Sequence, residues 1–348
     1  MANNDPQFEQ RKRDHLRIAL DSTVQSSQSA GLESISLIHE ALPDLNFEDI
    51  DLSSDLNGHK LSAPFFVSSM TAGHEHGHRV NLALAKLSER RQILMGVGSQ
   101  RRELQDPAAA AEWTTLRKEA PRAILAGNLG IAQLITASTD QVRAMVDRLD
   151  AKALFIHLNS LQECLQPEGT PHFRGGLEAI SRVVKNVDVP VIIKETGCGF
   201  SKETLKRLGN TGIFAVDLAG LGGTHWGRVE GQRAPVGSLQ AEASSAFADW
   251  GISTLQSLQN AKEAQVSFQI WASGGVRTGV DVAKLSSMGV KLVGLAVPWL
   301  QAAVQPDAEA ALDRLADRLS FELKTSLFCT GSKNLAELQS GSKWTWRT

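Results

Sequence analysis

Short apolar runs alternate with longer amphipathic patterns along the chain from about Pro64 onward. Runs rich in β-branched and other apolar residues are typical of buried strands, and the amphipathic segments between them are typical of helices that cover a sheet. The strand candidates are 63–69, 93–98, 122–128, 153–159, 190–195, 213–220, 267–275 and 291–297. Eight βα units favour a closed (β/α)₈ TIM barrel, an α/β fold, over an open doubly wound sheet.

Helical patterns fill most of the intervals between these runs, and one more follows the last strand. The helix candidates are 79–91, 107–118, 140–149, 177–186, 201–208, 279–287 and a C-terminal helix over 309–327. We expect three parts: an N-terminal extension (1–62) with a polar helix-like stretch around 9–20, the barrel (63–330), and a polar, mobile tail (331–348). Nothing reads as a flexible linker between independent domains.

Composition narrows the class of protein. The 36 Lys and Arg residues nearly balance the 38 Asp and Glu residues, so no general field attracts nucleic acid or an anionic membrane, and an anion must be held by a local cluster. The chain lacks a signal-peptide pattern and an apolar run long enough to span a membrane, so we expect a soluble, cytoplasmic protein. Its 3 cysteines are too few and scattered for a disulfide framework.

Polar residues are concentrated at the C-terminal ends of the predicted strands, the face on which barrel enzymes build their sites. They are Ser68, Ser69, Ser99, Asn128, His157, Asn159, Lys194, Glu195, Asp217 and Ser273. A flavin ring needs hydrogen bonds to its edge and a positive charge where reduction places negative charge. Thr71, Ser99, Asn128 and Lys194 supply that set; taken singly, each could be a hydrogen-bonded polar residue of the core.

The segment ASGGVRTG (272–279) follows the seventh strand and opens a helix, and GLAVP (294–298) ends the eighth. Loops in these two places commonly bind phosphate in barrels, because glycine lets backbone N–H groups approach the anion and a helix N-terminus adds its dipole. Gly274 and Gly275 are the candidate phosphate cradle. The alternative is that the two glycines only make a tight turn.

The fourth strand leads into HLNSLQECLQPEG (157–169). Mg²⁺ binds through one or two carboxylates together with substrate phosphates, which makes Glu163 the candidate metal ligand; otherwise it is a solvated loop acid. The N-terminal cluster RKRDH (11–15) could fold over the barrel mouth, where Arg11, Lys12 and Arg101 would surround a diphosphate. Otherwise this cluster is a solvated helix face.

The glycine-rich segment 217–233 after the sixth strand predicts a long active-site loop rather than a helix. Thr224 could reach the flavin phosphate or ring. Trp226 could wall an apolar substrate pocket or pack under the loop. The histidines of MTAGHEHGH (70–78) are interpreted as surface loop residues.

The motifs RKxxH (Arg11, Lys12, His15), SSMTAG, GVGSQR, GNLG, HLNxxQE, KExGxG, GGTxW and ASGGVRTG occur in this order. Together they resemble the type 2, flavin-dependent isopentenyl diphosphate isomerases, over about residues 11–300. The chain departs from that pattern at Ala72, where the family usually has glycine, and at His225, where a smaller polar residue is commoner. Neither departure removes a chemical group.

The resemblance implies an isomerase of isoprenoid biosynthesis that uses FMN and Mg²⁺, is reduced by NADPH, and forms homo-tetramers or homo-octamers. It assigns FMN contacts to Ser69, Met70, Thr71, Ser99, Asn128, Lys194, Thr224, Gly274, Gly275, Val276, Leu295 and Ala296. It assigns substrate contacts to Arg11, Lys12, Ser99, Gln100, Arg101, His157, Asn159 and Gln162, and Mg²⁺ to Glu163.

The implied reaction moves a proton along an allylic system and passes through a state with carbocation character. Reduced FMN is the expected acid and base, because it can exchange a proton at N5 and its electron-rich ring stabilises a nearby cation. Lys194 would stabilise its negative charge, Gln162 would position or relay a proton, and His157 is a further acid–base candidate. Two rivals remain: an FMN-dependent oxidoreductase on the same barrel, and a flavin-free phosphate-binding barrel.

Overall fold

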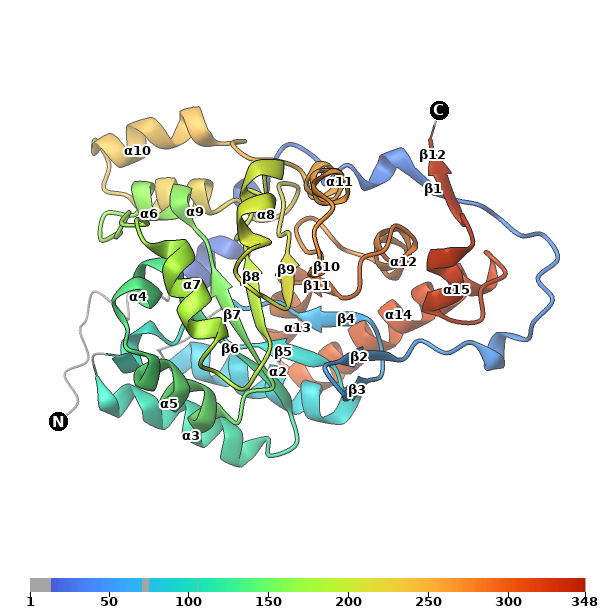
Figure 1. Cartoon of the computed structure of the whole chain (residues 1–348), viewed down its shortest axis with the longest axis horizontal. Helices are drawn as coiled ribbons and strands as arrows, with labels where there is room; N and C mark the ends of the chain where they lie inside the picture. The colour runs from blue at the N-terminus through green and yellow to red at the C-terminus, as the bar shows by residue number, and fades with distance from the viewer. Residues whose placement is uncertain (1–13, 71–74, 105, 348) are drawn as a thin grey trace.

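Eight parallel strands form a barrel in the computed structural model, which describes residues 14–70, 75–104 and 106–347 (Figure 1). The strands are β4 (Phe65–Val67), β5 (Leu94–Gly96), β6 (Ile124–Gly130), β7 (Ala153–His157), β8 (Val191–Lys194), β9 (Ala215–Asp217), β10 (Gln269–Trp271) and β11 (Val293–Leu295). Each coincides with one of the apolar runs. The predicted barrel is confirmed.

The barrel closes through the pairing of its first and last strands. β11 pairs in parallel with β4, and a bridge between Ala272 and Val293 joins the end of β10 to β11. The N–H of Ala272 donates to the carbonyl oxygen of Leu292 at 3.0 Å, and the N–H of Gly294 donates to the carbonyl oxygen of Ala272 at 2.8 Å. No strand of the ring is therefore left with an open edge.

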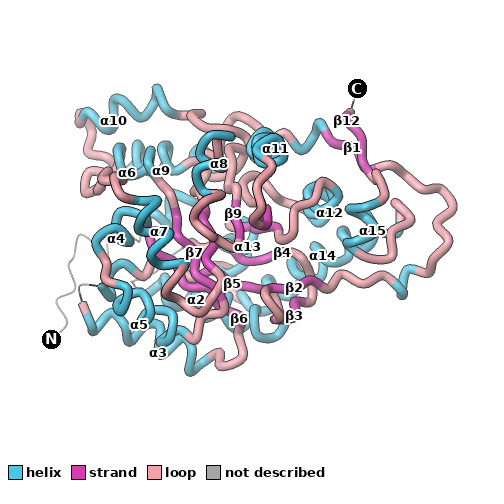
Figure 2. Tube along the Cα trace, in the orientation of Figure 1, coloured by secondary structure: helices cyan, strands magenta, loops and turns pink. Residues whose placement is uncertain are grey.

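Helices follow every strand of the barrel and form the outer layer (Figure 2). They are α2 (Glu75–Arg91), α3 (Ala110–Glu119), α5 (Thr139–Leu149), α7 (Gly176–Val184), α8 (Lys202–Leu208), α11 (Thr254–Ala264), α12 (Gly279–Ser287) and α14 (Ala308–Phe328). Shorter helices precede some of them: α4 (Ile131–Thr136), α6 (Ser160–Leu165), α9 (Trp226–Arg233), α10 (Leu239–Ser244) and α13 (Val297–Ala303). Of the outer helices, α11 was not predicted. None of the described helices is long and apolar enough to cross a membrane.

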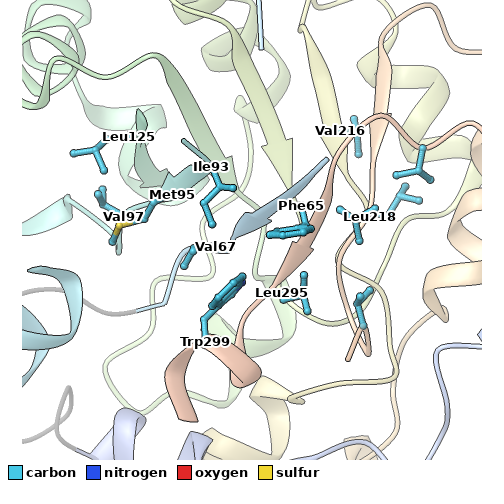
Figure 3. Packing of buried hydrophobic residues seen from close by; sticks show 14 of the residues in the cluster. Phe65, Val67, Ile93, Met95, Val97, Leu125, Val216, Leu218, Leu295 and Trp299 are labelled. Carbon is cyan, nitrogen blue, oxygen red and sulfur yellow. The ribbon is translucent and has the colours of Figure 1, made fainter. Parts of the chain in front are cut away.

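Alternating residues of each strand enter two separate cores. Phe66 belongs to the cluster inside the barrel, whereas its neighbours Phe65 and Val67 belong to the layer between strands and helices (Figure 3). This is the alternation that a strand buried on both faces requires. Leu56 of β2 (Ser54–Leu56) and Leu61 of β3 (His59–Leu61) belong to the inner cluster, so this hairpin of the N-terminal extension closes off the barrel interior.

The prediction of a mobile C-terminal tail and the prediction of a long loop over residues 217–233 were both wrong. The tail is ordered: it forms α15 (Leu335–Ser340), and β12 (Trp344–Trp346) pairs antiparallel with β1 (Ile35–Leu37). This ribbon joins two ends of the chain, a pairing that a local pattern cannot reveal.

The segment 217–233 is also only partly a loop, because α9 begins at Trp226. Its glycines are required by close packing rather than by flexibility. A Cβ atom at Gly231 would overlap the side chain of Ser244 in α10, so glycine is needed there for α9 to approach α10. A Cβ atom at Gly227 would lie 2.8 Å from Cε1 of His225, the N-cap residue of α9 itself, and 3.1 Å from Leu161 Cδ2 of α6. In this segment glycine therefore indicates a closely packed helix rather than a flexible loop.

Candidate active site

A pocket opens at the C-terminal ends of the barrel strands, and most of the predicted site residues converge on it. Those that line it are Ser69, Met70, Ser99, Arg101, Asn128, His157, Asn159, Gln162, Glu163, Lys194, Thr224, Gly274, Gly275, Val276, Leu295 and Ala296. Arg11, Lys12 and Thr71 lie outside the described residues. The side chains of the histidines at 74 and 76 likewise fall outside the description, and His78 lies in α2 rather than in the predicted loop.

Gln100 lies behind the pocket wall rather than on it. Its side chain is buried, its Oε1 accepts the N–H of Asn128 at 3.1 Å, and its Nε2 donates to Glu103 Oε1 at 3.1 Å. The amide therefore supports the strand end that carries Asn128. This arrangement does not favour the direct substrate contact that the resemblance implies for Gln100.

Three serine hydroxyls at the ends of the first two barrel strands have no hydrogen-bond partner within the described residues. Ser68 and Ser69 follow β4, and Ser99 follows β5; each Oγ atom is buried and lines or borders the pocket. A buried hydroxyl without a partner is costly, and proteins rarely leave several together unless a ligand or water satisfies them. The pocket wall thus offers hydrogen-bonding groups for a polar ring edge.

Lys194 enters the pocket from the end of β8 and is held by its neighbour on β9. Its Nζ donates to Asp217 Oδ2 at 3.1 Å, and Ser273 Oγ donates to Asp217 Oδ1 at 2.8 Å. Lys194 and Asp217 are 6% and 0% exposed, respectively. Because three strand ends share this contact, the ammonium group has one fixed position, as a residue that stabilises charge on a bound ring requires.

The Gly274–Gly275 turn follows β10 and is compact enough to need glycine at both positions. Their φ angles are +96° and +76°, and a Cβ on Gly275 would lie 2.6 Å from the Cβ of Ala30. Neither N–H donates to an acceptor in the described part of the chain. These two groups are therefore available to an anion, consistent with the predicted cradle.

The helix that follows this turn, α12, offers fewer N–H donors to an anion than the sequence predicts. The N–H groups of Arg277 and Thr278 both donate to Asp281 Oδ2 at 3.0 Å, and the N–H of Gly279 donates to Glu322 Oε2 at 2.6 Å. The first turn of α12 is thus satisfied by a capping box. Its dipole remains, but its first N–H donors are used within the protein.

His157 and Asn128 form a pair at the ends of β7 and β6. His157 Nδ1 lies 3.0 Å from Asn128 Oδ1. With the side-chain amide oxygen of Asn128 as acceptor, Nδ1 carries the proton, and Nε2 is the ring nitrogen that can accept one.

Gln162, on α6, is fixed by a network that sequence analysis did not identify. Its Nε2 donates to Glu230 Oε1 at 2.8 Å, and His15 Nε2 donates to the same oxygen at 2.9 Å. Arg233 Nε donates to Glu230 Oε2 at 2.9 Å. Burial raises the pKa of Glu230, but the hydrogen bond and charge of His15 and the charge of Arg233 outweigh it and lower this pKa to about 2.

If residues 226–233 are interpreted as a helix, the sequence also identifies Glu230. Trp226, Glu230 and Arg233 are spaced i, i+4 and i+7, which places them on one face of a helix. Trp226 lines the pocket, and its ring packs edge-on against His15 with centroids 5.1 Å apart. It is therefore both a wall of the pocket and a packing residue.

Glu163 lies in the pocket next to Arg101. Its Oε1 accepts from Asn159 Nδ2 at 2.9 Å and its Oε2 accepts the N–H of Thr170 at 2.5 Å, and the residue is 4% exposed. Burial lowers the pKa of Arg101, and the charge of Glu163 opposes this. Within the described residues no three metal-binding side chains gather, so an ion here would depend on ligands from the substrate.

Comparison with known sequences gives close relatives over almost the full chain. An isopentenyl-diphosphate delta-isomerase of Bdellovibrio bacteriovorus is 57% identical, covering 98% of this chain and 99% of that protein. Proteins of the same name from Legionella pneumophila (strain Corby) and a Nostoc species are 49% and 42% identical; each covers 97% of this chain, and the alignments span 98% and 96% of those proteins. Residues 157–345 match the FMN-dependent dehydrogenase family.

Solved structures resemble the chain in fold. A flavocytochrome b2 variant with pyruvate bound has a TM-score of 0.66 at 18% identity, covering 96% of this chain and 82% of that one. A mandelate oxidase variant has a TM-score of 0.59 at 15% identity, covering 99% and 98%. At these identities the likeness establishes the barrel and nothing about the chemistry.

Proposed function

The chain belongs to the isopentenyl-diphosphate delta-isomerase family, and we propose that its pocket binds FMN and converts isopentenyl diphosphate to dimethylallyl diphosphate. One observation carries the proposal: the flavin-type residues Ser99, Asn128 and Lys194 and the substrate-type residues Gln162 and Glu163 line a single pocket. Neither set alone would distinguish this enzyme from other barrels that bind phosphate.

The buried serine hydroxyls and the glycine turn fit FMN. The described residues that would hold it are Ser69, Met70, Ser99, Asn128, Lys194, Thr224, Gly274, Gly275, Val276, Leu295 and Ala296. In its reduced form FMN supplies an electron-rich face for developing positive charge and an exchangeable proton. Lys194, whose ammonium group is fixed by Asp217, would stabilise negative charge on the ring.

The other residues orient the substrate. Gln162 accepts from Asn159 Nδ2 at 3.2 Å and donates to Glu230, so both ends of its amide are fixed and its role is to position groups. His157, with its proton on Nδ1, can accept a proton at Nε2. Arg101 would bind the diphosphate together with Arg11 and Lys12, and this remote binding orients a small apolar tail that offers few contacts of its own.

The proposal also includes details that follow from family membership alone. Mg²⁺ would bind Glu163 and the substrate diphosphate, and NADPH would reduce the flavin. We further propose a cytoplasmic homo-oligomer, a tetramer or octamer, whose N-terminal extension (1–62) contributes to the substrate site.

An NMR assay with isopentenyl diphosphate in D₂O tests the proposal. Under anaerobic conditions, enzyme with FMN and Mg²⁺ should form deuterated dimethylallyl diphosphate only after reduction by NADPH or dithionite, and NADPH consumption should end once the flavin is reduced. The second candidate, an FMN-dependent oxidoreductase, is favoured by the dehydrogenase family match. NADPH consumed mole for mole with product would favour that candidate and refute the isomerase.

A further inference from the structure

A strand-like segment of the N-terminal extension lies along the loop that follows β9. Gln25 and Thr224 form an antiparallel bridge. The N–H of Ser26 donates to the carbonyl oxygen of Gly223 at 2.8 Å, and the N–H of His225 donates to the carbonyl oxygen of Val24 at 2.9 Å. These backbone contacts fix the segment against one wall of the pocket.

Gln25 extends this contact with both ends of its amide. Its Nε2 donates to Thr224 Oγ1 at 3.1 Å, and its Oε1 accepts from Arg277 Nη2 at 2.8 Å. Thr224 and Arg277 line the pocket, whereas Gln25 stands behind them. An amide is suited to this place because it offers a donor and an acceptor side by side.

The side-chain hydrogen bonds of Arg277 go to neutral acceptors. Besides Gln25 Oε1, it donates from Nη1 to the carbonyl oxygen of Val276 at 3.0 Å. Both acceptors are neutral, and within the described residues Arg277 forms no ion pair. Burial lowers its pKa, opposed by the charge of Asp281, which itself caps α12. A buried guanidinium remains charged and favours an anion beside it.

We infer that Gln25 is a positioning residue for the phosphate of the flavin: it holds Arg277 and Thr224 beside the Gly274–Gly275 turn. The inference rests on the proposed function, since it takes FMN as the ligand. It also extends the role of the N-terminal extension, which then completes the cofactor end of the pocket as well as the substrate end. Gln25 and Arg277 are 252 residues apart in sequence, so only the folded chain brings them together.

Binding of FMN and of riboflavin to the cofactor-free protein tests this inference, because the two flavins differ only in the phosphate. Gln25→Met keeps the size of the side chain and removes both hydrogen bonds. It should weaken FMN binding about ten- to a hundredfold, the usual effect of disturbing a charge-assisted contact, and leave riboflavin binding unchanged. Flavin fluorescence quenching measures both affinities.

Two further variants sharpen the comparison. Gln25→Glu accepts from Arg277 but neutralises its charge, so it should weaken FMN binding at least as much and again spare riboflavin. Gln28→Met, on an exposed side chain of the same segment, should match the wild type for both flavins. Circular dichroism melting confirms that each variant is folded.

Equal loss of FMN and riboflavin affinity in Gln25→Met would mean that Gln25 only supports the loop. Affinities equal to those of Gln28→Met would mean that it contributes nothing. Either result overturns the inference while the wild type still binds FMN and isomerises its substrate. Wild-type protein that fails to bind FMN would instead refute the proposed function, and this inference with it.

Discussion

Glu195 stabilises a turn of the pocket wall at the end of β8. The N–H groups of Thr196, Gly197 and Cys198 all donate to its Oε2. Burial raises its pKa to about 7, against the opposing effect of these donors and of Lys194. Because the native carboxyl group keeps its proton to higher pH than the unfolded one, it stabilises the fold at low pH and loses that contribution as pH rises toward neutrality.

Glu195→Gln should therefore change how stability depends on pH. The amide oxygen can still accept from the turn, but the side chain no longer titrates. The free energy of unfolding of the wild type, relative to the variant, should fall by about 3 kcal/mol between pH 4.5 and pH 8. Urea unfolding at several pH values measures it, and a constant difference would contradict the assigned titration.

Glu163 is expected to matter for the metal and not for the flavin. Glu163→Gln keeps the shape of the side chain and removes the charge that offsets Mg²⁺. The variant should bind FMN normally, lose most of its activity, and recover part of it only at far higher Mg²⁺ concentration. Glu168→Gln, on a neighbouring carboxylate that pairs with Arg233, should keep the wild-type Mg²⁺ requirement. Wild-type behaviour of Glu163→Gln would place the metal elsewhere.

Helix α9 begins after His225, which is its N-cap residue. His225 Nδ1 accepts the N–H of Arg228 at 3.3 Å and caps the helix, and Nε2 donates to the carbonyl oxygen of Trp250 at 3.0 Å. Burial lowers its pKa, and the nearby charge of Arg228 acts in the same direction. The neutral imidazole thus hydrogen-bonds both to the first turn of the helix that carries Trp226 and Glu230 and to the backbone at Trp250.

His225→Ala should loosen α9, because it removes both the cap and the bond to Trp250. The expected loss of stability is about 2–3 kcal/mol. His225→Ser can still cap the helix, so its loss should be smaller. Hydrogen exchange of peptides covering 226–233 should be fastest in His225→Ala and intermediate in His225→Ser; equal exchange in all three proteins would show that other contacts hold the helix.

The seam between the first and last βα units closes the protein into a ring. Arg91, at the end of α2, donates from Nε to Asp313 Oδ1 and from Nη1 to Asp317 Oδ1, both at 2.7 Å, and Arg90 donates from Nη2 to Asp313 Oδ2 at 2.9 Å. These bonds tie α2 to α14 over the pairing of β4 with β11. A network of this kind contributes more than an isolated surface pair.

Arg91→Met should lower the free energy of unfolding by about 1–2 kcal/mol at low salt, and by less in 1 M NaCl, where screening weakens the wild-type network. Arg122→Met is the control, since Arg122 is 84% exposed and pairs only with Glu89 among the described carboxylates. Its effect should stay below about 0.5 kcal/mol. A salt-independent loss in Arg91→Met would assign its role to packing. FMN affinity should be unchanged in both variants.

Local patterns were enough to predict the barrel and most of the pocket. Strand alternation and the polar residues at strand ends depend on neighbours in sequence, and parallel closure brings those ends to one mouth whatever the details of the loops. These patterns therefore predict that Ser99, Asn128 and Lys194 belong to one site. The boundaries of the three proposed parts of the chain stay predictions.

The tertiary structure decided what depends on distant contacts. Glu230 reaches His15 across 215 residues, Gln25 reaches Arg277 across 252, and the tail forms a strand only because β1 offers it an edge. The glycines of segment 217–233 predict a loop from sequence alone, but in α9 the close packing of the helix accounts for Gly231. Hydrogen bonds between such remote side chains leave no periodic trace in the sequence, because their geometry exists only once the barrel has placed the elements that carry them.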